Sequence, residues 1–142
     1  MLIAVTFLAI LIINIVIGFI QTHINPDALK PESYPEKNVI NVVYGILIAP
    51  IFETLVTQKW LYNLFLDLSK NIFLAIILSA IIFGALHYYS SFTIVRAFFC
   101  GLILNGCYVI SLAKSEKTAF WNTAIVHGIW NTFAAIIAYF NL

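Results

Sequence analysis

Four polar side chains that could take part in catalysis, three of them ionisable, interrupt otherwise apolar stretches of this sequence. They are the carboxylate of Glu53, the imidazole of His87, and the pair His127 and Asn131, which lie one helical turn apart. A carboxylate near an imidazole is a reasonable general-base assembly. An imidazole N–H and a carboxamide N–H on one helix face can both point at one developing oxyanion. The residue types are therefore those that a hydrolytic site needs.

The composition indicates that these side chains must be held within a membrane protein. The chain has 142 residues, of which 63% are hydrophobic and 9% charged, and its mean hydropathy is +1.01. Soluble domains carry about 25% charged residues. A water-soluble globule of this size could not bury so much apolar surface. The net charge of +1 gives no basic surface for nucleic acid, so we expect no nucleic-acid partner.

Apolar runs long enough for membrane helices divide the chain. A transmembrane helix needs about 20 mostly apolar residues. We therefore predict an all-α, polytopic, multi-pass membrane helix bundle in which residues 1–142 form one domain. The five expected spans are residues 2–20, 39–58, 71–90, 92–113 and 118–142.

The segments between these spans are predicted to lie outside the bilayer core. Residues 1–20 form an N-terminal anchor helix, 21–38 an extramembrane loop that contains His23, and 39–142 the core that carries the chemistry. Residues 59–70 are an interfacial connector. Arg96, near the start of the fourth span, is expected to extend its side chain to the interface.

The cost of ionisable groups in lipid favours a common site. Inserting a carboxylate at the bilayer centre costs about 2.5–3.5 kcal/mol even on the membrane-insertion scale, which gives the lowest values. Taken singly, Glu53 could be a protonated structural residue and His87 could cap the end of a helix. His127 and Asn131 could form hydrogen bonds between helices. One carboxylate and two imidazoles on separate helices are most easily accommodated in one hydrated pocket. Pro50 should bend the helix beside Glu53 and make room for water.

Three motifs resemble those of the CPBP family, which comprises CAAX prenyl endopeptidases and bacteriocin-processing or self-immunity proteins. They are "APIFETLVTQ" at residues 49–58, "FGALH" at 83–87 and "HGIWN" at 127–131. The family's motifs are Glu-Glu-x-x-x-Arg, Phe-x-x-x-His and His-x-x-x-Asn on successive membrane helices, and the order and spacing fit. The resemblance makes residues 39–142 a CPBP-like catalytic core with a four-helix, motif-bearing centre.

The resemblance implies a glutamate-type intramembrane endopeptidase in a bacterial cytoplasmic membrane. By position, Glu53 and His87 would activate the hydrolytic water, and His127 with Asn131 would stabilise the oxyanion. Phe83 occupies the motif's aromatic position. The expected substrate is a membrane-associated peptide or a prenylated or leader-bearing protein, surrounded by membrane lipid. No cofactor is expected; the alternative is zinc, bound by the glutamate and the two histidines.

The chain departs from the family pattern at two points. Thr54 and Gln58 replace the second glutamate and the arginine, so both charges of a possible pair are absent together. Replacing both partners of a buried pair is far cheaper than losing one. We therefore expect Thr54 and Gln58 to support the site through hydrogen bonds. The chain also has one helix before the first motif where relatives often have more, and a homodimer or a partner subunit could complete the wall.

Two other functions remain open on the sequence. A catalytically inactive relative would bind or scaffold a peptide partner, and the altered first motif favours this alternative. A proton or ion relay could use the glutamate and the histidines, but the sequence has no inverted repeat of the kind that transporters use.

Overall fold

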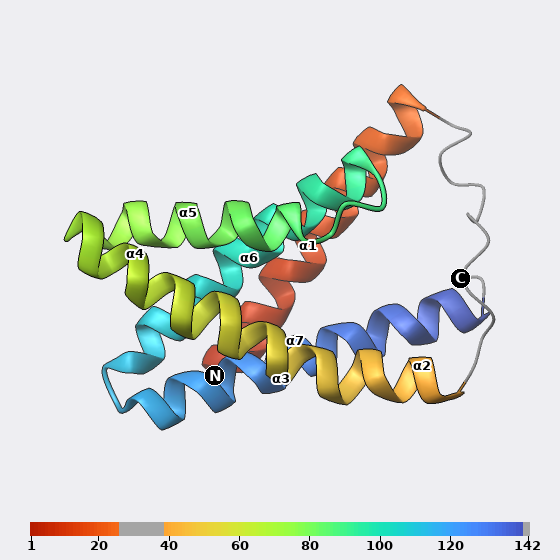
Figure 1. The fold of residues 1–142 in the computed structure, drawn as a ribbon. Helices are drawn as coiled ribbons and strands as arrows, with labels where there is room; N and C mark the ends of the chain where they lie inside the picture. The colour runs from red at the N-terminus through yellow and green to blue at the C-terminus, as the bar shows by residue number, and fades with distance from the viewer. Residues whose placement is uncertain (26–38, 141–142) are drawn as a thin grey trace.

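The structure is a computed structural model that describes residues 1–25 and 39–140. All the regular elements of these residues are helices, which confirms the all-α class (Figure 1). Two segments, η2 and η3, have the wider π-helical hydrogen-bond pattern. The elements are α1 (Leu2–Ile24), α2 (Val39–Val43), η2 (Tyr44–Ile48), α3 (Ala49–Glu53), η3 (Thr54–Leu61), α4 (Tyr62–Ser69), α5 (Ile72–Ala85), α6 (Ser91–Leu112) and α7 (Glu116–Phe140).

The elements from α2 to α4 follow one another as a single long helix, seen from orange to yellow-green in Figure 1. The second span was predicted to end at Gln58 and residues 59–70 to form an interfacial connector. The helix runs past Gln58 to Ser69, because residues 59–69 contain neither proline nor glycine. The helix ends at Lys70, whose φ of 53° is left-handed. Asn71 then starts α5 by accepting a hydrogen bond from the Leu74 N–H at 3.1 Å.

The prediction for Pro50 was a disturbed helix next to Glu53. The disturbance takes the form of π-helical turns on both sides of α3 rather than a simple break. In η2 the Ala49 N–H donates to the Tyr44 carbonyl, five residues back. Such π turns are rare and are frequently found at functional sites.

Three helices of the described residues are long and apolar enough to cross a membrane: Leu2–Ile24, Ile40–Ser69 and Ser91–Leu112. The sequence predicted five spans. The third is shorter than expected, because α5 has 14 residues and rises only about 21 Å against an apolar core of about 30 Å. The helix α7, with 25 residues, is not among the three. Large apolar side chains are exposed along α1, as a lipid-facing helix requires.

Close packing of α5 on α6 fixes the position of Phe83. A Cβ at Gly101 would lie 3.0 Å from the Phe83 ring, and a Cβ at Gly84 would lie 3.0 Å from the Ile94 carbonyl. The two glycines therefore let the helix backbones approach. Phe83 is buried in the core beside Leu104 and Val126. Both cysteines, Cys100 and Cys107, are buried and free.

The first helix is longer than predicted and is tied to α6. Gln21, expected in the loop, lies in α1 and is 8% exposed. Its Oε1 accepts a hydrogen bond from Arg96 Nη2 at 2.7 Å. The Arg96 side chain therefore bonds to the neighbouring helix α1. The sequence had predicted that it would extend to the membrane interface instead. His23 lies in the last turn of α1, and the rest of the predicted loop, 26–38, lies outside the described residues.

Candidate active site

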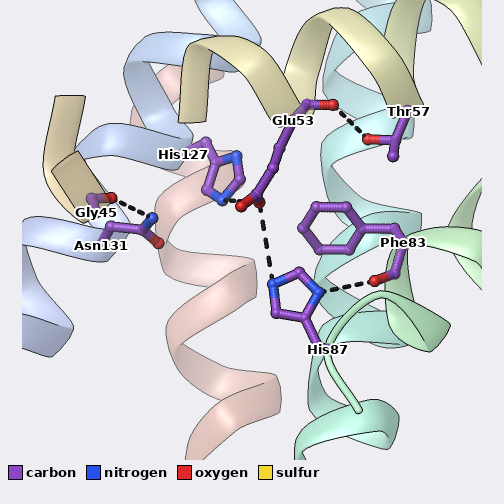
Figure 2. A network of polar contacts seen from close by, with 7 residues as sticks. All are labelled: Gly45, Glu53, Thr57, Phe83, His87, His127 and Asn131. Atoms are coloured by element: carbon purple, nitrogen blue, oxygen red, sulfur yellow. Dashed lines mark hydrogen bonds and ion pairs between the residues drawn. The ribbon is translucent and has the colours of Figure 1, made fainter. Parts of the chain in front are cut away.

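The structure brings Glu53, His87 and His127 together from three parts of the chain (Figure 2). Glu53 ends α3, His87 follows α5, and His127 lies in α7. The Nε2 atom of His87 lies 3.9 Å from Glu53 Oε2, and that of His127 lies 3.6 Å from the same oxygen. One carboxylate oxygen therefore faces two imidazoles.

His87 lies two residues beyond the end of α5, whereas the sequence predicted helix to residue 90. Its backbone N–H donates to the Gly84 carbonyl at 3.0 Å, and its Nδ1 bonds to the Phe83 carbonyl at 2.7 Å. Ser90 then starts α6 by accepting from the Thr93 N–H. A carbonyl only accepts, so Nδ1 carries the proton. In the neutral ring, Nε2 then presents a lone pair toward Glu53.

Phe83 holds both imidazoles by ring contacts. Its centroid lies 4.7 Å from that of His87 and 5.7 Å from that of His127. The second contact is edge-to-face, a preferred aromatic geometry. His127 is 4% exposed, and within the described part of the chain its Nδ1 has no hydrogen-bond partner. The His127 ring is therefore oriented by packing against Phe83 and not by a hydrogen bond at Nδ1.

The distances suit a water-activating site. Separations of 3.6 and 3.9 Å are longer than a direct hydrogen bond. Two atoms this far apart can both lie about 2.8 Å from one water oxygen. The side chains of Glu53 and His87 are each about 30% exposed, and that of His127 is 5% exposed. The Oε2 atom of Glu53 is itself buried and, among the described residues, has no hydrogen-bond partner.

Asn131 lies one turn beyond His127 on α7, and its side chain bonds to the long helix. Its Nδ2 donates to the Gly45 carbonyl at 2.9 Å (Figure 2). An amide nitrogen carries two hydrogens, so one remains for another acceptor. The structure thus gives Asn131 a partner that the sequence did not predict.

The positions that depart from the family pattern are deeply buried. Thr54 and Gln58 are each 0% exposed. Among the described residues, the Thr54 hydroxyl and both polar atoms of the Gln58 amide have no hydrogen-bond partner, so the expected bonds are not formed. The π-type register of η3 changes which side chains are neighbours in this segment.

Sequence reasoning missed Thr57, which does bond at the site. Its hydroxyl donates to the Glu53 carbonyl at 2.7 Å, and its own carbonyl accepts from the Ser79 hydroxyl at 2.5 Å. The two bonds tie the turn after the glutamate to α5. A threonine four residues after Glu53 was a visible signal, since threonine commonly bonds to the carbonyl four residues back.

The zinc alternative finds no fitting ligand set. Across residues 1–25 and 39–140, no three His, Cys, Asp or Glu side chains are arranged to hold a metal ion. The expectation of a metal-free site stays a prediction, which elemental analysis of the purified protein would test.

The comparison with protein families decides the family. Residues 35–133 match the family of type II CAAX prenyl endopeptidase Rce1-like proteins, and this range includes all three motifs. The chain belongs to that family. The family is one of CAAX-type intramembrane proteases, which supports a protease function at the level of the family. No curated protein and no solved structure matches the chain.

The Rce1-like chain contains a second copy of the local Phe-x-x-x-His geometry. In α1, His23 Nδ1 lies 2.9 Å from the Phe19 carbonyl, and the two rings are 4.2 Å apart. This matches the arrangement of Phe83 and His87. His23 is exposed and has no carboxylate partner among the described residues. The Phe-x-x-x-His motif by itself therefore produces only a local hydrogen bond near a helix end. The nearby carboxylate of Glu53 distinguishes His87 from His23.

An apolar groove of about 550 Å³ runs between α7 and the segment η2–α3 of the Rce1-like core. Its walls come from the sequence neighbours of the site residues, such as Pro50 and Gly128, and from none of Glu53, His87 or His127. The lining residues are Phe7, Ile46, Leu47, Pro50, Ile51, Trp121, Ala124, Ile125, Gly128, Ile129, Thr132, Phe133 and Ile136.

Proposed function

We propose that this chain is a multi-pass membrane endopeptidase that uses a glutamate-activated water to hydrolyse a peptide bond of a membrane-associated or prenylated substrate. The observation that carries the proposal is the approach of His87 Nε2 and His127 Nε2 to one Glu53 oxygen, at 3.9 and 3.6 Å. Paired acid–base groups this close, within reach of water, are what hydrolysis needs.

The proposed reaction begins when Glu53 removes a proton from a water that also bonds to His87 Nε2. The water oxygen attacks the carbonyl carbon of the scissile bond, and the carbonyl π electrons move onto oxygen. The Nε2–H of His127 and the second Nδ2–H of Asn131 stabilise that oxyanion. When the tetrahedral intermediate collapses, the C–N bond breaks and the amine leaves with the proton that Glu53 took.

Three further side chains support the site in this proposal. Phe83 packs against both imidazoles. Thr54 and Gln58, fully buried beside Glu53 in sequence, take the place of the family's charged pair. Their neutrality avoids a buried, unpaired charge at these two positions.

The groove supports an apolar group on the substrate. Its lining is almost entirely hydrocarbon, and it lies along the same two helical segments that carry Glu53 and His127. A prenyl or other lipid chain would gain burial there, at about 25 cal/mol for each Å² of apolar surface. The peptide attached to that chain would then lie close to the carboxylate.

The test is a cleavage assay with the protein in lipid nanodiscs and a prenylated peptide read by mass spectrometry. Wild type is expected to release products that Glu53→Gln and His87→Ala do not. Matched controls are Asp67→Asn, an exposed carboxylate, and His23→Ala, an exposed histidine; both should cleave normally. Normal cleavage by both Glu53→Gln and His87→Ala would end the proposal.

A second candidate is a catalytically inactive protein that binds or scaffolds a peptide. The replacement of the motif's glutamate and arginine by Thr54 and Gln58 favours it. Under this function, wild type releases no product, while wild type and Glu53→Gln retain the same labelled peptide in a pull-down. Comparative peptide mass spectrometry of membranes with each form distinguishes the two functions.

A further inference from the structure

The hydrogen bond from Asn131 exists because Pro50 leaves a helix carbonyl without its usual donor. In an α-helix the Gly45 carbonyl would accept from the Ala49 N–H, but that N–H donates to Tyr44. In a π-helix it would accept from residue 50, which is proline and has no N–H. The Gly45 carbonyl accepts from Asn131 Nδ2 instead, at 2.9 Å.

The two helices are built to meet at this point. Gly128 lies three residues before Asn131, on the same face of α7. A Cβ at Gly128 would lie 3.2 Å from the Ile46 carbonyl, which is closer than ordinary van der Waals contact. The glycine thus lets α7 approach the carbonyls of Gly45 and Ile46. Pro50 itself is buried.

We propose that Pro50 is a positioning residue for catalysis, because it frees the Gly45 carbonyl that orients the Asn131 amide. This inference rests on the proposed function, in which Asn131 donates to the oxyanion. The Gly45 carbonyl can only accept, so it selects Nδ2 over Oδ1. With one N–H held there, the direction of the second is set. An amide free to turn over would present Oδ1, whose lone pairs repel an oxyanion.

The decisive variant is Pro50→Ala, which restores an N–H at residue 50. That N–H can bond to the carbonyl of Gly45 or Ile46 and let the α-helix continue. The Gly45 carbonyl then gains a helix donor that competes with Asn131, and its bond to the Asn131 amide weakens. We expect a higher thermal unfolding temperature, since proline is unfavourable inside helices. We also expect kcat to fall by about 10- to 100-fold, less than the loss of about 10²–10³-fold when an oxyanion donor is removed outright. Because Pro50 also lines the groove, KM is read with a peptide that has no prenyl group and should change little. A purely structural role would not couple greater stability to a lower kcat.

A double-mutant cycle with Asn131→Ala tests the link itself. In the wild-type background, Asn131→Ala should lower both the unfolding temperature and kcat. In the Pro50→Ala background, Asn131→Ala should lower the unfolding temperature and kcat by less than about a third of its effect in wild type. The reason is that the effects of coupled residues are not additive. Gly106→Ala is the control for helix stiffening: it lies in α6 with open space around the added Cβ, and it should leave kcat unchanged.

The outcomes distinguish failure of the link between Pro50 and Asn131 from failure of the proposed hydrolytic function. Additive effects of the two substitutions on the unfolding temperature would overturn the link, whatever the activity. Wild-type kcat in Pro50→Ala, beside a large loss in Asn131→Ala, would overturn the positioning role. Coupled unfolding without any Glu53-dependent cleavage would instead overturn the proposed function and the catalytic part of this inference together.

Discussion

His127 Nε2 lies 3.6 Å from Glu53 Oε2, and this approach joins the last helix of the chain to the middle of the longest one. The imidazole is 4% exposed, whereas the glutamate side chain is 29% exposed. The imidazole is therefore almost closed to solvent, while the glutamate side chain as a whole is partly exposed. Its Oε2 atom, which faces both imidazoles, is buried.

Replacing Glu53 by glutamine should abolish hydrolysis while the fold is kept. The amide has nearly the same shape but does not accept a proton from water at neutral pH. We expect kcat/KM to fall by at least about 10²–10⁴-fold, the usual contribution of a general base. Product formation in nanodiscs measures it, with Asp67→Asn as the carboxylate control. Residual cleavage within threefold of wild type would contradict the assignment.

His87→Ala should lose both a helix-end hydrogen bond and the Nε2 atom that accepts a hydrogen bond from the attacking water. Loss of the bond from Nδ1 to the Phe83 carbonyl should cost about 1 kcal/mol of unfolding free energy. Loss of Nε2 should lower kcat by about 10²–10⁴-fold.

His23→Ala is the matched control, because it removes the same bond to a carbonyl four residues back without touching the site. The two variants should show similar losses of stability and very different activities. Equal activities would show that His87 is a helix cap and nothing more.

Reintroducing the family's charged pair should reveal whether positions 54 and 58 still face each other. Gln58→Arg alone places a charge at a fully buried position and should cost about 3–5 kcal/mol of stability. Adding Thr54→Glu should recover most of that loss. Thermal unfolding in detergent measures both.

The control for this pair is Thr57→Glu with Gln58→Arg. Thr57 is also 0% exposed, but adjacent helical residues do not face each other. This combination should therefore recover little. Equal recovery by the two glutamates would mean that any nearby carboxylate suffices and that position 54 has no special geometry.

Filling the groove should weaken binding of lipidated substrates. Ile129 lines it and is 44% exposed, so Ile129→Trp can add volume without disturbing the core. KM for a prenylated peptide should rise about tenfold, equivalent to about 1.4 kcal/mol, and KM for the same peptide without the prenyl group should not change. Ile110→Trp, at an exposed position on α6 outside the groove, is the control. The same KM shift for both peptides would rule out the groove as a lipid site.

Much of the site was predictable because ionisable groups are expensive in lipid. Glu53, His87 and His127 stand out from apolar runs in the sequence, and that cost required partners for them. The local Phe-x-x-x-His pattern was less informative. Phe19 and His23 form the same contacts as Phe83 and His87, so a local motif could not show which histidine meets a carboxylate.

The sequence by itself determined an all-α membrane protein and the candidate acid–base residues, because hydropathy and the cost of burying charge depend on residue type. The tertiary structure alone decided which atoms face one another. The Phe83 carbonyl selects Nδ1 of His87 and leaves Nε2 for Glu53. The Gly45 carbonyl selects Nδ2 of Asn131. Hydrogen-bond direction is set by the positions of donors and acceptors in space, which segments far apart in the chain acquire only when their helices pack.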